Sequence, residues 1–386
     1  MPRIKLTALP HQHCLQAKFE IITPMFLGDA NQKATSIRPT SIKGALRFWW
    51  RAINAHLSLD ELAKQEAKLF GTAEQNIGQG CFSINVTHLN LKAGSIGVNE
   101  REPAAGVVKY SAQHYLLGQG LTSVRNAFES GTFTVELLFM PKADKKAIEQ
   151  IETALLAFAC LGSLGSRARH GWGSIALVDL SGNQFIKMPK TKEEYRQALT
   201  MLSKDKINGL PQYTAFSSQT RIDIVQSGGN VQNLLNLAGQ QLQLYRSFGN
   251  NGKVGKINAE RNFTEDHDLI RDHLTGTPAT KAPKRVIFGL PHNYFFSSVS
   301  SNNKAEIHAY AGSEKTRRTS PLFTLIRKIG NQFYLLHALF PAVFLPDQME
   351  IRFKDGHRKL NFAPDYKVIE DYLNRPAFKD AERVLP

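Results

Sequence analysis

Two arginines and a histidine lie in a glycine-rich stretch, SLGSRARHGWGSIALV, at residues 163–178. Glycine lets a backbone approach a ligand closely because it has no Cβ atom. Guanidinium groups bind phosphate oxygens through paired N–H donors. The stretch therefore favours a phosphate-bearing ligand, and Trp172 is placed either to stack on that ligand or to pack in the core. The residues expected to bind are Arg167, Arg169 and His170.

A second group of cations follows a helical spacing within RPTSIKGALRFWWRA, residues 38–52. Three cations recur at every fourth position and a tryptophan lies one helical step away, so the four share one stripe. A solvated face is the alternative. However, no acidic residue occurs between Asp29 and Asp60, whereas a solvated helix normally mixes both signs. The stripe is therefore interpreted as a phosphate-binding face. Its members are Lys43, Arg47, Trp50 and Arg51.

Two further cations, Lys33 and Arg38, precede this helix in the polar stretch LGDANQKATSIRPTS. The free amides and the dipole at a helix N-terminus favour an anion there. The alternative is that this stretch is an ordinary loop without a ligand. Because it directly precedes the cationic stripe, it is interpreted as part of the same phosphate-binding site. The hypothesis is that the helix cations and those of residues 163–178 converge in a single positive cleft.

The composition supports a polyanionic partner. The 386 residues include 48 Lys and Arg against 33 Asp and Glu, which gives a net charge of +15 and a pI near 9.7. Each phosphate that such a surface neutralises releases counterions, so a nucleic acid is the first candidate and a membrane surface the second. No segment approaches the ~18 apolar residues of a membrane span, and residues 1–16 lack the apolar centre of a signal peptide. A soluble, cytoplasmic protein is expected.

Metal and cofactor motifs are weak. Three separated cysteines, Cys14, Cys81 and Cys160, favour free thiols over a disulfide framework or a zinc knuckle. HQHC at residues 11–14 lacks a second ligand pair, and the acidic stretch TEDHDLIRDH at residues 264–273 is better explained as a solvated helix start than as a metal site. Neither G-x-x-x-x-G-K-[ST] nor a helix-opening G-x-G-x-x-G occurs. No metal and no cofactor are expected.

The first half of the chain predicts a strand, helix, strand, strand, helix, strand order, which is the split βαβ pattern of a ferredoxin-like domain. Thr40 or Ser41 is expected to cap the first helix. The predicted elements are a strand over 16–26, a helix over 40–57, strands over 80–90 and 131–140, a helix over 143–165 and a strand over 172–180.

A second domain of similar but more decorated architecture is expected after a charged connector at residues 186–210. The fold class predicted is therefore α+β, with tandem ferredoxin-like domains over residues 1–185 and 211–386. A loop with a short helix is expected over 249–283 and a charged tail with one helix over 364–386. The remaining elements are a strand over 213–225, a helix over 230–249 and strand-like runs over 284–290, 318–329 and 332–345.

Three segments in the first half resemble the RAMP superfamily of CRISPR proteins, and within it the family of first subunits of the Cmr, type III-B, effector complex. They are TPMFLGDANQ at 23–32, IRPTSIKGALRFWWRA at 37–52 and LGSLGSRARHGWGSI at 161–175. FGLP at 288–291 and RRTSPLF at 317–323 also resemble that family's second domain, which adds Arg317 and Arg318 to the candidate RNA-binding residues.

This resemblance implies a non-catalytic subunit of a cytoplasmic ribonucleoprotein, whose partners are the guide RNA, single-stranded target RNA and other Cmr subunits. The family's role is to help capture target RNA near the 3′ end of the guide. A metal-independent endoribonuclease that processes the guide precursor is the alternative, with His170 or His56 as general base or acid, although no partner histidine or tyrosine is placed by the sequence. A structural cap that docks a neighbouring subunit is a third interpretation.

Overall fold

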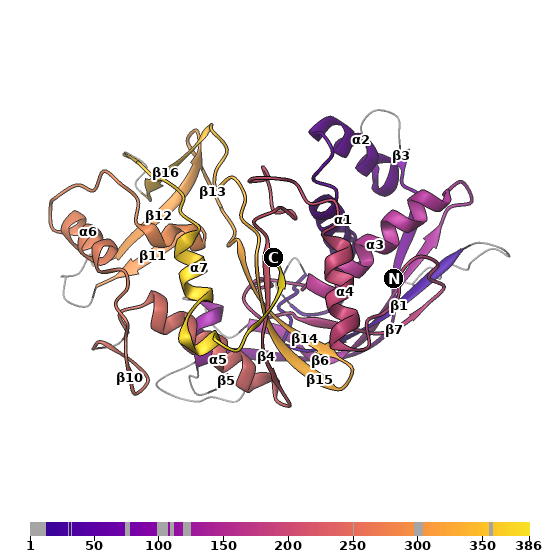
Figure 1. Cartoon of the computed structure of the whole chain (residues 1–386), viewed down its shortest axis with the longest axis horizontal. Coiled ribbons are helices and arrows are strands. Elements are labelled where there is room, and N and C mark those ends of the chain that lie inside the picture. The colour runs from indigo at the N-terminus through magenta and orange to yellow at the C-terminus, as the bar shows by residue number, and fades with distance from the viewer. Residues whose placement is uncertain are drawn as a thin grey trace.

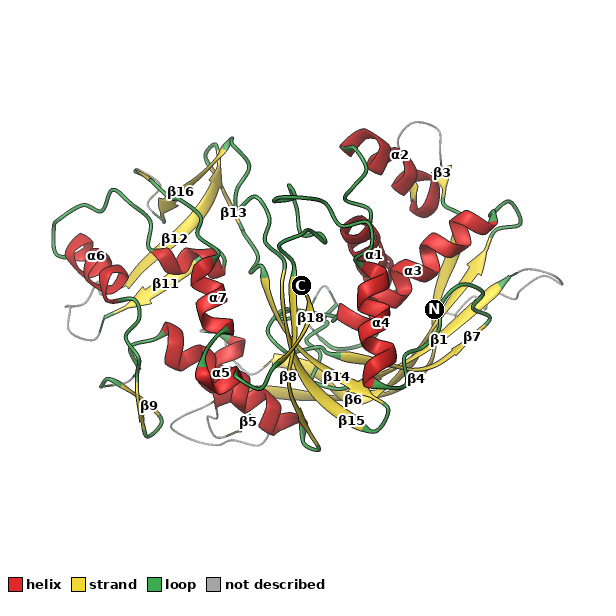
Figure 2. Cartoon of the chain, in the orientation of Figure 1, coloured by secondary structure: helices red, strands yellow, loops and turns green. Residues whose placement is uncertain are grey.

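The computed structural model describes residues 13–386 except for 30, 32, 74–77, 99–106, 109–111, 119–124, 250, 297–303 and 355–357. His11, one of the two histidines of HQHC, lies outside the described residues. Two antiparallel sheets meet near the middle of the molecule, and helices pack against them (Figures 1 and 2). The predicted α+β class is confirmed.

The first sheet has the strand order β4-β6-β1-β7, and its three neighbouring pairs are antiparallel. Helix α1 joins the first two strands in sequence and α3 joins the last two, so each helix crosses over one strand, as the split βαβ pattern predicts. A short strand, β5, runs parallel to the end of β4. The elements are β1 (Cys14–Ile21), α1 (Pro39–Ile53), β4 (Phe82–Val98), β5 (Val107–Val108), β6 (Arg125–Phe139), α3 (Lys145–Leu161) and β7 (Ile175–Ser181).

The second sheet repeats this arrangement in the second half, with the order β14-β15-β8-β18. Read across the sheet, its strands are again the second, third, first and fourth in chain order. Helices α5 and α7 take the positions that α1 and α3 have in the first half. Its elements are β8 (Arg221–Gly228), α5 (Val231–Arg246), β14 (Leu322–Ile329), β15 (Gln332–Leu339), α7 (Lys367–Leu373) and β18 (Glu382–Leu385).

Two insertions decorate the second half. One separates α5 from β14 and the other separates β15 from α7, and together they form the sheet β11-β12-β16-β17, on the left in Figure 1. The inserted elements are β9 (Lys253–Val254), β10 (Ile257–Asn258), α6 (Thr264–Leu274), the 3₁₀ helix η3 (Lys284–Phe288), β11 (His292–Phe295), β12 (Lys304–Ala311), β13 (Glu314–Thr316), β16 (Met349–Phe353) and β17 (Lys359–Leu360). The remaining short elements are β2 (Gly71–Thr72), β3 (Gly78–Gln79), η1 (Ala112–Leu117) and η4 (Pro376–Phe378).

Two helices are present where none was predicted. Helix α2 (Leu59–Phe70) begins at Ser58, whose side chain accepts from the backbone amide of Glu61 while that glutamate accepts in return. Helix α4 (Lys192–Leu202), within the predicted connector, begins with the same reciprocal arrangement of Thr191 and Glu194. Three side chains of α4 are buried in the core, so this segment is a packed element; they are Tyr195, Leu199 and Leu202.

Some predicted boundaries are wrong. Helix α1 has Arg38 as its N-cap residue and Pro39 in its first turn, so neither Thr40 nor Ser41 caps it. Proline suits that place because its fixed φ matches the helix and its missing N–H would be unpaired there. Residues 284–290, predicted as a strand, contain η3, and residues 213–220 precede β8 and lie outside it.

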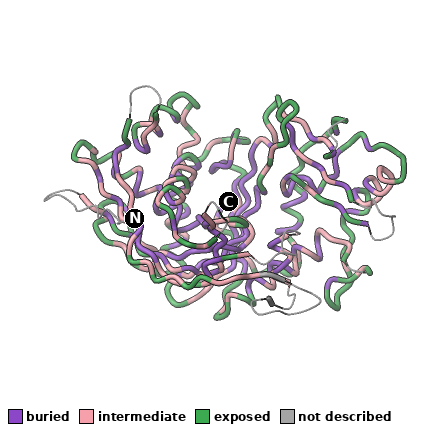
Figure 3. Tube along the Cα trace, turned by 180° about the vertical axis from the view of Figure 1, so that it is seen from behind, coloured by how far each residue is buried: buried purple, intermediate pink, exposed green. Residues whose placement is uncertain are grey.

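The buried apolar side chains form two core clusters, and the two halves share both of them. Trp49 of α1 packs against Phe323 and Phe340 of the second half, with ring centroids 6.1 and 6.0 Å apart. Arg327 of β14 is buried and donates to the carbonyl oxygens of Cys160 and Gly162, at the end of α3, over 2.6 Å each. Figure 3 shows buried residues concentrated where the halves meet.

Cys14, Cys81 and Cys160 are unpaired, and burial raises the pKa of Cys81 to about 11 and that of Cys160 to about 12. In the described part of the chain, no helix has the length and apolar character needed to cross a bilayer.

Candidate nucleic-acid interface

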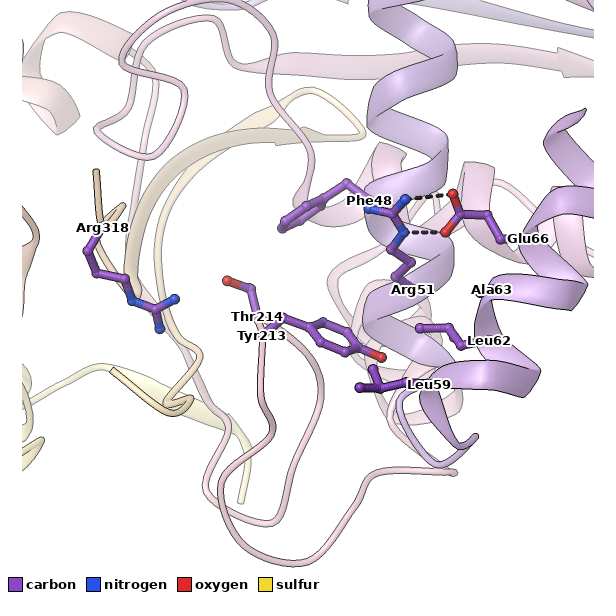
Figure 4. A pocket seen from close by; sticks show the side chains of 9 residues that line it. All are labelled: Phe48, Arg51, Leu59, Leu62, Ala63, Glu66, Tyr213, Thr214 and Arg318. Carbon is purple, nitrogen blue, oxygen red and sulfur yellow. Dashed lines mark hydrogen bonds and ion pairs between the residues drawn. The ribbon is translucent and has the colours of Figure 1, made fainter. Parts of the chain in front are cut away.

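The predicted cationic stripe of α1 is engaged by an acid from the neighbouring helix. Glu66 of α2 is 6% exposed and accepts from Arg47 Nε at 2.8 Å and from Arg51 Nη2 at 2.6 Å. Figure 4 shows the Arg51 contacts as two parallel bonds. Burial by itself would raise the pKa of Glu66, but hydrogen bonds from Arg51 and Arg47 hold it below its ordinary value. These two guanidinium groups therefore form an internal ion-pair cluster.

Trp50 is not available to stack on RNA. Its side chain is fully buried, its Nε1 donates to Gln150 Oε1 at 3.1 Å, and its ring meets Phe70 edge-on. The spacing of the three cations predicted that Trp50 shares their stripe. In the structure its indole packs against α2 and α3 and is enclosed in the core. Lys43 is partly buried, with its ammonium group 5.8 Å from the centroid of the Phe82 ring.

The hypothesis of a single cleft shared by α1 and the glycine-rich loop is therefore wrong. The α1 cations lie beside α2 and none of them lines the cleft that the loop forms. Lys33 and Arg38 are exposed and also lie outside that cleft, with Arg38 donating to the Gly28 carbonyl at 3.4 Å.

The glycine-rich loop is held tightly between the two halves. Ser166 donates its amide to Phe26, and the backbones of Gly171 and Arg169 pair with Thr324 of β14 over 2.7 and 2.9 Å. A Cβ atom on Gly173, which has φ of +63°, would lie 1.9 Å from the Leu164 carbonyl, so only glycine fits there. The loop is a fixed platform for its cations.

These loop cations line a cleft of about 1560 Å³ between the halves. None of the described residues that line it is Asp or Glu. Its arginines come from the start of β6, the glycine-rich loop, the end of α5, η3 and the segment before β14; they are Arg125, Arg167, Arg169, Arg246, Arg285, Arg317 and Arg318. The structure thus brings together the predicted loop residues and the predicted pair Arg317 and Arg318.

Six of the seven cleft arginines form no ion pair within the described part of the chain. Among the described residues, only Arg285 forms an ion pair, with Asp266 of α6 at 3.4 Å. Desolvation by the walls of the cleft and the neighbouring charges of Arg125 and Arg317 lower the pKa of Arg167, although its side chain stays open to solvent. Burial and Arg318 lower that of Arg169 to about 10. Cations that depress one another's pKa in this way form a concentrated positive field, which an anionic ligand would relieve.

Two of these arginines are fixed by packing. Arg169 places its guanidinium 4.3 Å from the Phe323 ring centroid and donates to the Ser320 carbonyl at 2.5 Å. Arg246 stacks 4.4 Å from the Phe288 ring centroid, and its buried Nε has no hydrogen-bond partner in the described structure. By contrast, Arg167 and Arg317 are exposed.

His170 is a poor proton donor in this setting. Burial, then the charges of Arg167, Arg246 and Arg169, lower its pKa to about 3, so its ring is neutral at physiological pH. The described residues offer its ring no hydrogen-bonding histidine, tyrosine or carboxylate. His56, the other catalytic candidate, is exposed beyond the end of α1.

The acidic stretch at residues 264–273 forms α6, but its start is not fully solvated. Asp266 is buried and accepts the backbone amides of Lys284 and Arg285 at 2.8 and 2.9 Å, which fixes η3. His267 lines the cleft and stacks on Phe248, with centroids 4.5 Å apart. Over the residues that the structure describes, no three His, Cys, Asp or Glu side chains gather as a metal site would require.

Residues 18–176 match the model of the RAMP superfamily. Residues 18–176 therefore form a RAMP domain, and the chain is homologous to Cmr1. The curated relative, CRISPR system Cmr subunit Cmr1-1 of Pyrococcus furiosus, is 23% identical over 337 residues, which cover 84% of this chain and 87% of that protein.

Two solved structures share the fold. The crystal structure of apo Cmr1 from Pyrococcus furiosus has a TM-score of 0.55 at 19% identity, covering 96% of this chain and 98% of the other. A chain of the type III-B Cmr-beta complex bound to cognate target RNA has a TM-score of 0.50 at 12% identity, with coverage of 94% and 98%.

The RAMP domain supplies only part of the cleft. Arg125, Arg167 and Arg169 belong to it, whereas the other four arginines come from the second half. Arg125, Arg246 and Arg285 were not predicted as site residues. Arg285 lies three positions before Phe288, the first residue of the motif FGLP, but this closeness along the chain does not show that the fold brings it to the glycine-rich loop.

Proposed function

We propose that this chain is a non-catalytic RNA-binding subunit of a type III-B CRISPR effector ribonucleoprotein. The observation that carries the proposal is the arginine cleft, whose described lining contains seven arginines and no carboxylate. The homology to Cmr1 and the fold shared with a chain of an RNA-bound Cmr complex support the same assignment. In this proposal the two halves are tandem ferredoxin-like domains, and the cleft lies between them.

The cleft would hold the sugar-phosphate backbone of single-stranded target RNA near the 3′ end of the guide RNA. Exposed guanidinium groups such as those of Arg167 and Arg317 can pair with phosphate oxygens. Phosphate contacts carry no sequence information, so base pairing with the guide would select the target. Other Cmr subunits would hold the chain within the assembly.

Catalysis is left out of the proposal because the histidine best placed for it is neutral. A general acid needs a pKa near the working pH, and burial among arginines lowers that of His170 to about 3. Guide-precursor cleavage in EDTA by the purified chain, abolished by His170→Ala, would contradict this part of the proposal.

The RNA-binding role is tested with the double variant Arg167→Ala, Arg317→Ala. Its control is Lys145→Ala, Lys146→Ala, which removes two exposed charges from the start of α3, outside the cleft. We expect the cleft variant to weaken binding of single-stranded RNA. The slope of log K against the logarithm of salt concentration should become shallower by about 1.4, which is ~0.7 for each lost phosphate contact. The control should change neither quantity.

Equal affinity and equal salt dependence for all three proteins would contradict the RNA-binding role. If the wild-type chain then still assembled with its neighbouring subunits, a structural cap would be the better description.

A further inference from the structure

A second pocket lies beside the arginine cleft and shares one residue with it. It has a volume of about 470 Å³ and lies between α1, α2 and the segment before β8 (Figure 4). The residues that define its character are Phe48, Leu59, Leu62, Tyr213, Thr214 and Arg318. Of these, Arg318 also lines the arginine cleft.

The pocket offers flat apolar walls to the solvent. Leu59, at the start of α2, is 63% exposed and lines this pocket, so its side chain adds apolar surface that a ligand there can contact. Phe48 and Tyr213 place two aromatic rings around the same space. The ion pair of Arg51 with Glu66 closes one wall, and its charges are already satisfied.

Polar groups lie at the side nearest the cleft. The Thr214 side chain points toward the space in front of Arg318 (Figure 4), and no other described residue hydrogen-bonds its hydroxyl. The buried Nε of Arg318 has no hydrogen-bond partner in the described structure. Arg169 of the cleft also lies over the Phe48 ring, 5.6 Å from its centroid, so cleft and pocket are in direct contact.

We propose that this pocket receives an unpaired nucleobase from the RNA strand whose phosphates occupy the arginine cleft. A base has two flat faces, which aromatic and apolar side chains can stack on, and a polar edge, which a hydroxyl and a guanidinium can bind. An apolar side chain of a protein partner would leave the Thr214 hydroxyl unpaired. This inference rests on the proposed RNA-binding role and assigns a second part of its ligand.

The experiment compares two strands of equal length, a single-stranded oligoadenylate and the same ribose-phosphate chain without bases. Both carry the phosphates, but only the first carries bases. We expect Tyr213→Ala to weaken binding of oligoadenylate by about tenfold, which corresponds to the loss of one stacked base, and to leave binding of the base-free strand unchanged. Tyr213→Phe should retain most of the affinity because it keeps the ring.

Controls separate this proposal from the RNA-binding role. Arg167→Ala should weaken both strands alike, and Ile257→Ala, at an apolar residue 48% exposed outside the pocket, should weaken neither. Should Tyr213→Ala fail to fold, Leu59→Gln tests the same wall from an exposed position. If the pocket variants affect both strands equally, or neither, the nucleobase pocket is overturned. If the wild-type chain binds neither strand, the RNA-binding role fails as well.

Discussion

His337 illustrates how the burial of one residue makes the stability of the folded chain depend on pH. Its side chain is fully buried between Thr324 and Tyr372, with ring contacts of 3.3 and 3.4 Å to their hydroxyls. Burial, followed by the charge of Arg221, lowers its pKa from 6.5 to about 3. In the unfolded chain the pKa returns to its ordinary value, so between these two values the unfolded state binds more protons.

The free energy of unfolding should therefore fall as the pH drops below about 6.5. His337 contributes up to about 1.4 kcal/mol per pH unit to that slope. We expect His337→Gln to show a shallower slope by this amount in urea titrations across the range, while His56→Gln, at an exposed histidine, should retain the wild-type slope. Parallel curves for His337→Gln and the wild type would contradict the assignment.

Arginine shows how far residue type alone can predict a site. Arg167 and Arg317 were predicted as ligands and do line the cleft, whereas Arg47 and Arg51 have the same side chain and pair with Glu66. Arg327, which belongs to no predicted site, is enclosed in the core. Charge and local spacing do not reveal the partner, because the partner comes from another element.

The pairing of α1 with α2 makes a prediction at the scale of elements. Removing both guanidinium groups with Arg47→Ala, Arg51→Ala leaves a nearly buried carboxylate without a partner. We expect the free energy of unfolding to fall by about 1 to 2 kcal/mol, less than for a fully buried ion pair, because the Arg47 and Arg51 side chains are 37% and 46% exposed. Adding Glu66→Leu should recover most of the loss, because the uncompensated charge is then gone. Chemical denaturation of the three proteins gives the measurement.

An exposed ion pair provides the control. Lys367 and Asp371 lie four residues apart on α7 and are both largely exposed, so Lys367→Ala should lower the free energy of unfolding far less than the double variant of α1 does. If the double variant of α1 behaved like this control, Glu66 would not be the residue that fixes the two arginines.

Helices whose apolar residues recur at a clear helical spacing were predicted well, whereas helices marked only by their capping residues were missed. The helices over 40–57 and 143–165 appear as α1 and α3 because their apolar residues recur at helical spacing. Helices α2 and α4 were missed, although Ser58 with Glu61 and Thr191 with Glu194 are spaced as capping boxes. Recognising α2 would have placed Glu66 beside the α1 cations. The apolar run at 284–290 was predicted as a strand because a short buried 3₁₀ helix carries the same composition.

At the scale of the whole molecule, the cleft depends on how the two halves are joined. Its arginines come from both halves, so their spacing is set by the shared core and by contacts such as those of Arg327 with the end of α3. Local sequence patterns carry no information on this long-range packing. For that reason Arg246 and Arg285 could not be assigned to the site from sequence.

A shared core predicts that the two halves unfold together. The three tryptophans, Trp49, Trp50 and Trp172, all lie in the first half and are buried, and Trp49 also packs on Phe323 and Phe340, so their fluorescence reports on the first half and on its contact with the second. Far-ultraviolet circular dichroism reports on both halves. Proteins of this size with separate domains usually lose structure in steps. Here we expect the two signals to give the same denaturant midpoint, because unfolding either half exposes the apolar surface that the other buries.

The variant Arg327→Leu tests the reason for that cooperativity. It leaves the carbonyl oxygens of Cys160 and Gly162 without their donor in the core, which should lower the free energy of unfolding by about 2 kcal/mol or more. Because Arg327 joins β14 to the end of α3, both signals should move to the same lower midpoint. Separate midpoints in the wild type would show two independent domains, and the cleft between them would then change shape as the halves move.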